Sequence, residues 1–168
     1  MAQRVKRIKD IMTTGVITVT PQDAVQKGIN LMADKNISCV VVVEGHGSKR
    51  PVGIVTERDL VKRVLKPRKN TKTTMIKAIM TSSIVSISEE ASPEEAMRVI
   101  ESMKIRRVPV VNDTGVVGLV TQSNIVRQMY DITMMNKRLT FHQNVQSYII
   151  IALAAIFIII FIIRFYFI

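Results

Sequence analysis

The chain has 168 residues, of which 24 are Lys or Arg and 13 are Asp or Glu, so its formal charge is +11. Apolar residues make up 48% of it, and they are concentrated in a C-terminal run. The roughly 147 residues before that run suffice for one domain, or for two small domains that share a core, which excludes a large catalytic barrel with accessory domains. Residues 1–70 contain 14 basic and 6 acidic side chains, so most of the positive charge lies in the first half.

Aromatic, histidine and cysteine residues are scarce in the first 147 residues. The first aromatic residue is Tyr130, so a basic surface before it has no platform on which single-stranded bases could stack. The two histidines and one cysteine of the chain are too few for a zinc site or a disulfide framework, and we expect no metal site. Cys39 lies in the apolar run ISCVVVV and is interpreted as a buried core thiol, with a reactive role as the alternative.

Residues 148–168 form an almost wholly apolar segment. Sixteen consecutive apolar residues from Tyr148 to Ile163 would make about 24 Å of helix, and continuation to Ile168 gives about 31 Å. The hydrocarbon core of a bilayer is about 30 Å thick, so we predict a transmembrane helix over 148–168, preceded by a juxtamembrane linker at 132–147. The basic residues before it predict a single-pass protein of the cell membrane, anchored at its C-terminus, with the rest in the cytoplasm. A buried oligomerisation helix is the alternative.

An internal repeat divides the chain before this segment. IKDIMTTGVITVT at residues 8–20 recurs as IKAIMTSSIVSIS at 76–88, a shift of 68 residues. PVGIVTERDLV at residues 51–61 recurs as VVGLVTQSNIV at 116–126, a shift of 65. The three missing residues fall where the loop EGHGSKR is replaced by NDTG, a turn composition that accepts deletions.

We therefore predict two repeats, over residues 8–66 and 76–131, joined by a basic linker at 67–75. Each repeat predicts the element order β-α-β-β-α, with opening strands over Val16–Val19 and Ile84–Ile87. A single repeat would be only about 55 residues long with an exposed apolar face, so we expect the two to pack sheet to sheet. The predicted fold class is mixed α/β (α+β): one pseudo-symmetric pair of repeats, followed by the transmembrane helix.

The first helix of each repeat has a start signal. In the first repeat this signal is Thr20 followed by Asp23, and in the second it is Ser92 followed by Glu95 as a capping box. Apolar residues recur behind these signals at helical spacing and are expected to face the sheet. They are Val25, Ile29, Met32, Met97, Ile100 and Met103.

The repeats resemble a known family. Two β-α-β-β-α units, each with a DIM or AIM start, a VVVV or VPVV strand and a G-apolar-apolar-T-x-x-D/N turn, resemble a tandem pair of CBS domains, the Bateman module. The resemblance covers residues 8 to about 130. It implies a non-enzymatic regulatory protein that binds an adenosine-containing ligand in the cleft between the repeats, and it implies a homodimer.

Candidate ligand-binding residues lie at the end of the last predicted strand of each repeat and just after it. Thr56 and Asp59 place a hydroxyl and a carboxylate three residues apart at a strand-to-helix junction. The residues alone favour an ordinary capping box, although such a carboxylate can also accept hydrogen bonds from a ribose. The resemblance implies the ribose role. The second repeat has Thr121 and Asn124, and because Asn carries no charge we expect the two sites to be unequal.

Two further groups complete the predicted site. Arg106 and Arg107 open a strand of the second repeat, where the resemblance implies phosphate binding and a solvated strand end is the alternative. The resemblance also implies that backbone groups contact the adenine. These are expected at Val16, Ile17, Ile37, Ile84, Val85 and Ile105.

The predicted ligand is an adenine nucleotide, AMP, ADP or ATP, ranked above S-adenosylmethionine, and no cofactor is expected. The chain has no P-loop spacing and no local setting for a catalytic triad, so we expect no catalytic residues and no enzyme activity. The basic clusters are interpreted as solvated surface, with anionic lipid next and nucleic acid last. The output is expected to pass to a membrane transporter or channel. Two alternatives are a basic regulatory protein that binds nucleic acid and a structural membrane adaptor with an empty cleft.

Overall fold

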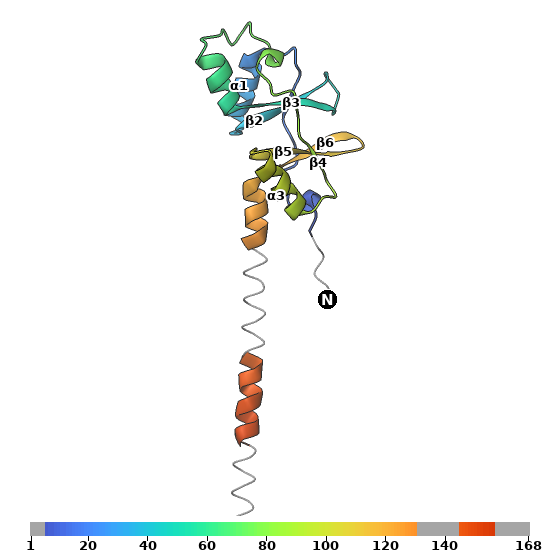
Figure 1. The fold of residues 1–168 in the computed structure, drawn as a ribbon, viewed down its shortest axis with the longest axis vertical. Coiled ribbons are helices and arrows are strands. Elements are labelled where there is room, and N and C mark those ends of the chain that lie inside the picture. The colour runs from blue at the N-terminus through green and yellow to red at the C-terminus, as the bar shows by residue number, and fades with distance from the viewer. Residues whose placement is uncertain (1–5, 131–144, 157–168) are drawn as a thin grey trace, which may run out of the picture. The chain divides into compact units, whose positions relative to one another are not determined.

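A computed structural model describes residues 6–130 and 145–156 of the chain (Figure 1). Its internal contacts divide the chain into two units, Met1–Ile125 and Val126–Ile168. The first unit contains two three-stranded sheets, one from each copy of the sequence repeat.

The first repeat folds as β1 (Thr18–Val19), α1 (Val25–Asp34), β2 (Cys39–Val43) and β3 (Pro51–Thr56). Strand β2 is central, parallel to β1 and antiparallel to β3. All of its residues are buried, which explains why this strand is a continuous apolar run rather than an alternating one.

The second repeat folds as β4 (Ile87–Ser88), α3 (Pro93–Ser102), β5 (Arg107–Asn112) and β6 (Gly115–Thr121). Strand β5 is central in the same way, parallel to β4 and antiparallel to β6. The order predicted from the sequence is therefore confirmed through the first four elements of each repeat. A helix follows each last strand, at α2 (Glu57–Leu60) and over residues 122–130.

The opening strands are shorter than predicted, because only two residues of each pair with the central strand as a strand. Val16 and Ile17 precede β1, where the chain has just turned at Gly15, whose φ is +70°. The Ile17 carbonyl still accepts a hydrogen bond from the Val41 N–H at 3.2 Å. These residues thus remain against the sheet while lying outside its regular ladder.

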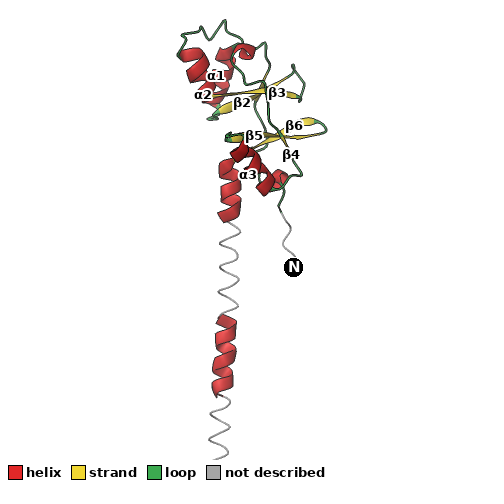
Figure 2. Ribbon diagram, in the orientation of Figure 1, coloured by secondary structure: helices red, strands yellow, loops and turns green. Residues whose placement is uncertain are grey.

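The two sheets pack against each other, as the sequence predicted (Figure 2). Val41 and Val43 of β2 form one buried cluster with Val116 of β6, and Ile84 and Leu119 pack against it. Helices α1 and α3 cover the outer faces of the two sheets (Figure 2). The first unit is therefore layered as helix, sheet, sheet, helix.

Two crossing segments, residues 8–13 and 76–81, connect the repeats, because each forms backbone hydrogen bonds with the repeat to which it does not belong. The Ile8 N–H donates to Ala91 O at 2.9 Å, and Thr13 and Leu119 exchange backbone hydrogen bonds at 2.9 Å. The second segment mirrors this arrangement on the first repeat, where Thr81 N–H donates to Ile54 O at 2.9 Å. Strand β6 of the second sheet thus pairs with the segment that precedes the first sheet, and β3 of the first sheet pairs with the segment that precedes the second.

A methionine in each crossing segment explains the recurrent Gly in the last strand of each repeat. A Cβ on Gly118 would lie 2.2 Å from the sulfur of Met12, and one on Gly53 would lie 2.9 Å from the sulfur of Met80. The sequence shifts relate Met12 to Met80 and Gly53 to Gly118. The Met of the IM start thus packs against the Gly of the turn motif, and the structure contains this contact once for each repeat.

The helix start predicted at Ser92 is confirmed, and the one predicted at Thr20 is wrong. Ser92 and Glu95 form a capping box at the start of α3. Thr20 and Asp23 instead close a turn, in which Thr20 N–H donates to Asp23 Oδ2 at 2.7 Å. Helix α1 begins only at Val25, where linker carbonyls accept from its first amides, including Thr74 O at 2.9 Å. The linker backbone replaces the capping side chain, which no local sequence signal reveals.

The apolar helix positions face the sheets as predicted, with one exception. Val25, Met32 and Ile100 are buried, and Ile29 and Met97 are partly buried against the cores. Met103 is 57% exposed because α3 ends at Ser102, so the helical phase no longer directs Met103 to the core.

The second unit is described over residues 126–130 and 145–156, and both stretches are helical. Across the described parts of the chain, none of the helices is both long enough and apolar enough to span a bilayer. Most of the predicted juxtamembrane linker and residues 157–168 of the predicted transmembrane helix lie outside the described residues.

Candidate ligand-binding site

A cavity of about 280 Å³, the cleft cavity, lies between the two repeats. The first repeat contributes Val16, Ile17 and Ile37, and the second contributes Arg107 and Thr121. These five residues were all predicted as site residues, and the structure brings them together. The remaining lining residues were not predicted, and they are Thr13, Thr14, Gly15, Asn36, Ser38, Cys39, Val41 and Leu119.

The crossing contact between Thr13 and Leu119 positions one wall of the cleft cavity. It holds the segment from Thr13 to Ile17 against β6, and β6 ends at Thr121. The segment therefore lies opposite the strand-to-helix junction of the other repeat, which is why the cavity takes residues from both. The sequence does contain a signal for Thr13 and Thr14, because they stand directly before Gly15, the residue at which the chain turns.

Arg107 bridges the repeats inside this cavity. Its Nη2 donates a hydrogen bond to the Ser38 hydroxyl, and its side chain is half-buried. A guanidinium has five N–H donors, so this bond leaves others for a ligand oxygen. Arg106, the other predicted arginine, is exposed and does not line the cleft cavity. The structure therefore separates the two arginines that the sequence placed together.

The Thr121 junction is a closed polar box. Thr121 N–H and its hydroxyl both donate to Asn124 Oδ1, at 2.9 Å and 2.6 Å, and Asn124 N–H donates back to Thr121 Oγ1 at 3.2 Å. The amide oxygen of Asn124 is thus engaged by Thr121. Its remaining polar group is the NH₂, which can only donate.

The Thr56 junction has the same geometry with a charge in it. Thr56 N–H and its hydroxyl donate to Asp59 Oδ2 at 2.9 Å and 2.6 Å, and Asp59 N–H donates to Thr56 Oγ1 at 3.3 Å. The capping box that the residues alone favoured is therefore confirmed. The second oxygen of Asp59, Oδ1, lies 3.6 Å from Arg63 Nε. Where Asn124 offers a donor, Asp59 offers an acceptor.

The other predicted contact residues correspond, through the repeat shifts, to residues that line the cleft cavity. The repeat shifts relate Val16, Ile17 and Ile37 to Ile84, Val85 and Ile105, and they relate Thr121 to Thr56. The Thr81 to Ile54 bridge holds the 81–85 segment to β3 as the Thr13 to Leu119 bridge holds its equivalent to β6. Ile84, Val85 and Ile105 do not line the cleft cavity itself. We call their location the counterpart position.

Cys39 lies at the edge of the cleft cavity and is buried and free, as predicted for a core thiol. Burial raises the pKa of its thiol, and nearby Glu57 adds to the effect while Arg107 opposes it. A thiol with a raised pKa is mostly protonated at neutral pH and is a poor nucleophile.

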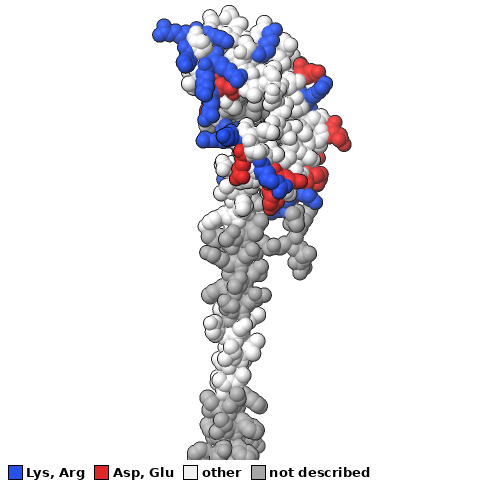
Figure 3. All heavy atoms as spheres, viewed as in Figure 1, with Lys and Arg blue, Asp and Glu red and all other residues white. Residues whose placement is uncertain are grey.

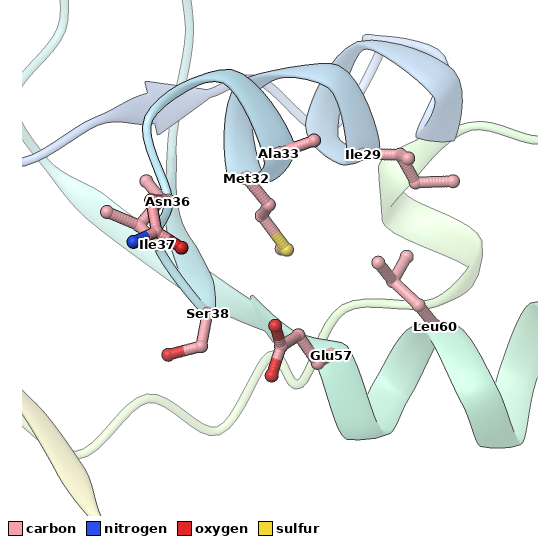
Figure 4. Close-up of a pocket in the computed structure, with 8 residues that line it drawn as sticks. All are labelled: Ile29, Met32, Ala33, Asn36, Ile37, Ser38, Glu57 and Leu60. Atoms are coloured by element: carbon pink, nitrogen blue, oxygen red, sulfur yellow. The ribbon is translucent and has the colours of Figure 1, made fainter.

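A second cavity of about 490 Å³ was missed by sequence reasoning (Figure 4). It lies between α1 and α2, where Met32 and Leu60 point toward each other and Glu57 stands beside Ser38 (Figure 4). The stretch from Asn36 to Ser38 lines both this cavity and the cleft cavity. Apolar periodicity predicted that α1 faces the core, but it does not indicate that a cavity lies between α1 and α2.

Basic side chains gather over the end of the first unit that carries α1 and the linker (Figure 3). In the stretch after α2 the basic residues are all exposed, and they are Lys62, Arg63, Lys66, Arg68, Lys69 and Lys72. Within residues 6–130 and 145–156, no three His, Cys, Asp or Glu side chains are grouped closely enough to hold a metal ion.

The CBS domain family model matches this chain twice, at residues 8–66 and 76–131. The chain is 32% identical over 123 residues to CBS domain-containing protein YhcV of Bacillus subtilis, covering 73% of this chain and 85% of that protein. It is 34% identical over 126 residues to an inosine-5′-monophosphate dehydrogenase of Korarchaeum cryptofilum, covering 74% of this chain. It spans only 25% of that dehydrogenase and 32% of another relative, from Methanocaldococcus jannaschii.

A solved structure agrees with these matches. The CBS domain pair of protein MJ0100, in complex with 5′-methylthioadenosine and S-adenosyl-L-methionine, superposes with a TM-score of 0.67 at 26% identity. The superposition covers 76% of this chain and 98% of that one. The chain therefore belongs to the CBS-domain family and contains a tandem pair of CBS domains.

Proposed function

We propose that this CBS pair is a non-catalytic regulatory module that binds an adenosine-containing ligand between its repeats. The observation that carries the proposal is the cleft cavity, which combines aliphatic walls, a threonine hydroxyl and a guanidinium. Aliphatic side chains such as Val16 and Ile17 suit the faces of a purine, and Arg107 suits phosphate oxygens. The volume, about 280 Å³, is near the lower end of small-molecule sites, roughly 300 Å³.

Two ligand positions of unequal chemistry are proposed. The first is the cleft cavity, with Arg107 and the neutral Asn124 junction. The second is the counterpart position, where Asp59 accepts from the hydroxyls of a ribose and Ile84, Val85 and Ile105 contact the base. The shift of 68 residues puts Arg106 where Ser38 stands in the cleft cavity, so Arg106 is the proposed phosphate contact there.

AMP, ADP and ATP are the leading ligand candidates, and S-adenosylmethionine follows. The related CBS pair in complex with S-adenosyl-L-methionine and 5′-methylthioadenosine supports an adenosine group as the common element. We expect no enzyme activity, because the site residues are capping groups, aliphatic side chains and arginines rather than a nucleophile with its base.

The proposed output is to a protein partner at the membrane, such as a transporter or channel. It is supported by the apolar composition of residues 148–168, which we propose as a single-pass anchor that keeps the CBS pair in the cytoplasm. A homodimer is the proposed assembly. The exposed cations that follow Arg63, which are Lys66, Arg68, Lys69 and Lys72, are proposed to lie near anionic lipid rather than nucleic acid.

The test is a binding screen on the full chain in a mild detergent. Thermal unfolding is followed with AMP, ADP, ATP, S-adenosylmethionine and 5′-methylthioadenosine, and hits are measured by calorimetry. A ligand at one hundred times its Kd stabilises the fold by about 2.7 kcal/mol, which is easily seen. Failure of all five compounds to stabilise the protein would overturn the proposal.

Asp59→Asn then tests the counterpart position. The substitution keeps the cap, as Asn124 shows, but removes the charge that accepts from a ribose. We expect at least one binding event to weaken about tenfold, because hydrogen bonds to charged groups contribute about 1.5–3 kcal/mol. Asp34→Asn, at the exposed end of α1, makes the same charge change at a residue that does not line the cleft cavity and should leave binding unchanged. Equal affinities in both variants would remove Asp59 from the site.

A further inference from the structure

Arg63 stands between the counterpart position and the connection that joins the repeats. Its Nη1 donates hydrogen bonds to Ile79 O at 2.7 Å and to Met80 O at 2.8 Å. On its other side, its Nε lies 3.6 Å from Asp59 Oδ1. One guanidinium therefore touches both the carboxylate and the crossing segment of residues 76–81.

The two contacts differ in strength, and the difference matters. Distances of 2.7 and 2.8 Å are those of strong hydrogen bonds, so the guanidinium is fixed on the backbone of Ile79 and Met80. The 3.6 Å separation from Asp59 is an ion pair without a direct hydrogen bond. Asp59 Oδ1 thus keeps its lone pairs for another donor, while the nearby positive charge favours one orientation of the carboxylate.

The backbone that Arg63 holds leads directly to predicted ligand contacts. Met80 is followed by Thr81, which pairs with Ile54 of β3, and three residues later the chain reaches Ile84 and Val85. Arg63 thereby fixes the carboxylate and the proposed base-contacting segment relative to each other. Among the hydrogen bonds and ion pairs of the described residues, no other side chain joins Asp59 to that segment.

The second repeat has no charges at the corresponding positions. The shift of 65 residues relates Asp59 to Asn124 and Arg63 to Gln128, so both charges are absent there together. Gln128 is buried, whereas Arg63 is exposed. The charged pair is therefore a feature of the first repeat alone and is not required by the repeated fold.

We infer that Arg63 is a positioning residue for ligand binding: it orients the Asp59 carboxylate and ties it to the crossing segment of residues 76–81. This inference rests on the proposed function, because it concerns the counterpart position. Arg63 does not contact the ligand. Its removal should weaken binding only through Asp59, which distinguishes it from a residue that merely supports the fold.

A double-mutant cycle tests this role with AMP as the probe and the full chain in detergent. Arg63→Gln, which copies Gln128, should weaken AMP binding about tenfold in the wild-type background. In the Asp59→Asn background the same substitution should change the affinity by less than about twofold, because the group through which it acts is gone. Lys62→Gln removes an exposed neighbouring charge and should have no effect in either background.

Arg63→Lys provides a second variant, which remains informative if Arg63→Gln fails to fold. It keeps the positive charge beside Asp59, and affinity within about threefold of wild type is expected. If the wild type binds AMP and Arg63→Gln weakens that binding by the same factor in both backgrounds, the positioning role alone is overturned. A wild type that binds none of the five adenosine compounds would overturn the proposed function, and the role of Arg63 with it; where another of the five binds in place of AMP, the cycle is run with that compound.

Discussion

The two strand-to-helix junctions make the same hydrogen bonds with different charges. Thr56 with Asp59 and Thr121 with Asn124 share donor distances of 2.9 and 2.6 Å. An uncharged amide oxygen therefore caps this helix as closely as a carboxylate does. The cap therefore gives no explanation for the charge of Asp59 or for its second oxygen, Oδ1, which lies 3.6 Å from Arg63 Nε. Ligand binding supplies one.

The arginines show the opposite asymmetry. Arg107 lines the cleft cavity with the neutral junction, whereas the position related to it by the repeat shift is Cys39, a buried thiol. The cavity with the neutral junction is lined by a half-buried cation, and the position related to that cation in the other repeat is uncharged. Each position thus combines groups from both repeats, and neither repeat carries a full set of charged groups.

Substitutions in the hairpin turns test the comparison between the repeats with the largest expected effect. Gly115 has a φ of +115°, and a Cβ on it would lie 2.4 Å from the carbonyl oxygen of Lys49 in the longer loop of the first repeat. We expect Gly115→Ala to lower the free energy of unfolding by about 3 kcal/mol, through strain and overlap with backbone. Urea unfolding of the full chain measures it.

The matched control is Gly45→Ala in the first repeat. A Cβ there meets no atom within 4 Å, and we expect a change below about 0.5 kcal/mol. Similar midpoints for the two alanine variants would show that the loops of the two repeats do not touch in solution. That outcome would also contradict the hydrogen bond from Val116 N–H to Lys49 O at 2.8 Å.

The arginine comparison is sharpened by ligands with and without phosphate. Arg107→Gln should weaken AMP binding at the cleft cavity by about tenfold while leaving adenosine nearly unchanged, because a charge-assisted hydrogen bond contributes about 1.5–3 kcal/mol. Arg106→Gln should spare the cleft cavity, since Arg106 does not line it. Calorimetry with both ligands reports the ratio. An equal loss of AMP and adenosine binding in Arg107→Gln would mean that Arg107 holds the cavity open through Ser38 rather than binding phosphate.

Much of the fold could be predicted from the sequence, because the repeat samples each element twice. The element order and the cap at Ser92 depend on periodicity and on residues close in the chain, and the packing of the sheets follows from the exposed apolar face that each repeat would have alone. The late start of α1 could not be found in this way. Its first amides donate to Thr71 and Thr74, which are more than forty residues away in the chain.

The candidate site was predicted as a set of residues but not as an arrangement. Val16 and Thr121 share the cleft cavity because the crossing segments exchange between repeats, and no spacing in the sequence encodes that exchange. For the same reason Arg106 and Arg107 could not be ranked from the sequence. Arg107 is the first residue of β5 and Arg106 precedes it. Adjacent side chains of an extended chain point to opposite sides, and the sequence alone leaves open which of the two enters the cavity.

The smallest expected effect concerns the carboxylates near the two first helices. Burial of the Asp23 carboxyl raises its pKa, but the Lys27 ammonium at 2.8 Å and the Thr20 N–H lower it by more, so the pKa lies below its ordinary value of 3.8. The pKa of exposed Glu95 is lowered chiefly by the Ser92 N–H. Both groups therefore stabilise the fold when they are ionised.

The sign of the pH dependence follows from the lowered pKa. The contribution of Asp23 to stability is fully present above pH 3.8 and is lost as the pH falls through the lower pKa of the folded state. Asp23→Asn keeps an acceptor for Thr20 but loses the ion pair with Lys27, so it should be less stable than wild type by less than about 1 kcal/mol at pH 7. Urea unfolding between pH 2 and pH 7 should show the two proteins converging at the acidic end. A difference that persists there would mean that shape, and not charge, makes Asp23 stabilising at this turn.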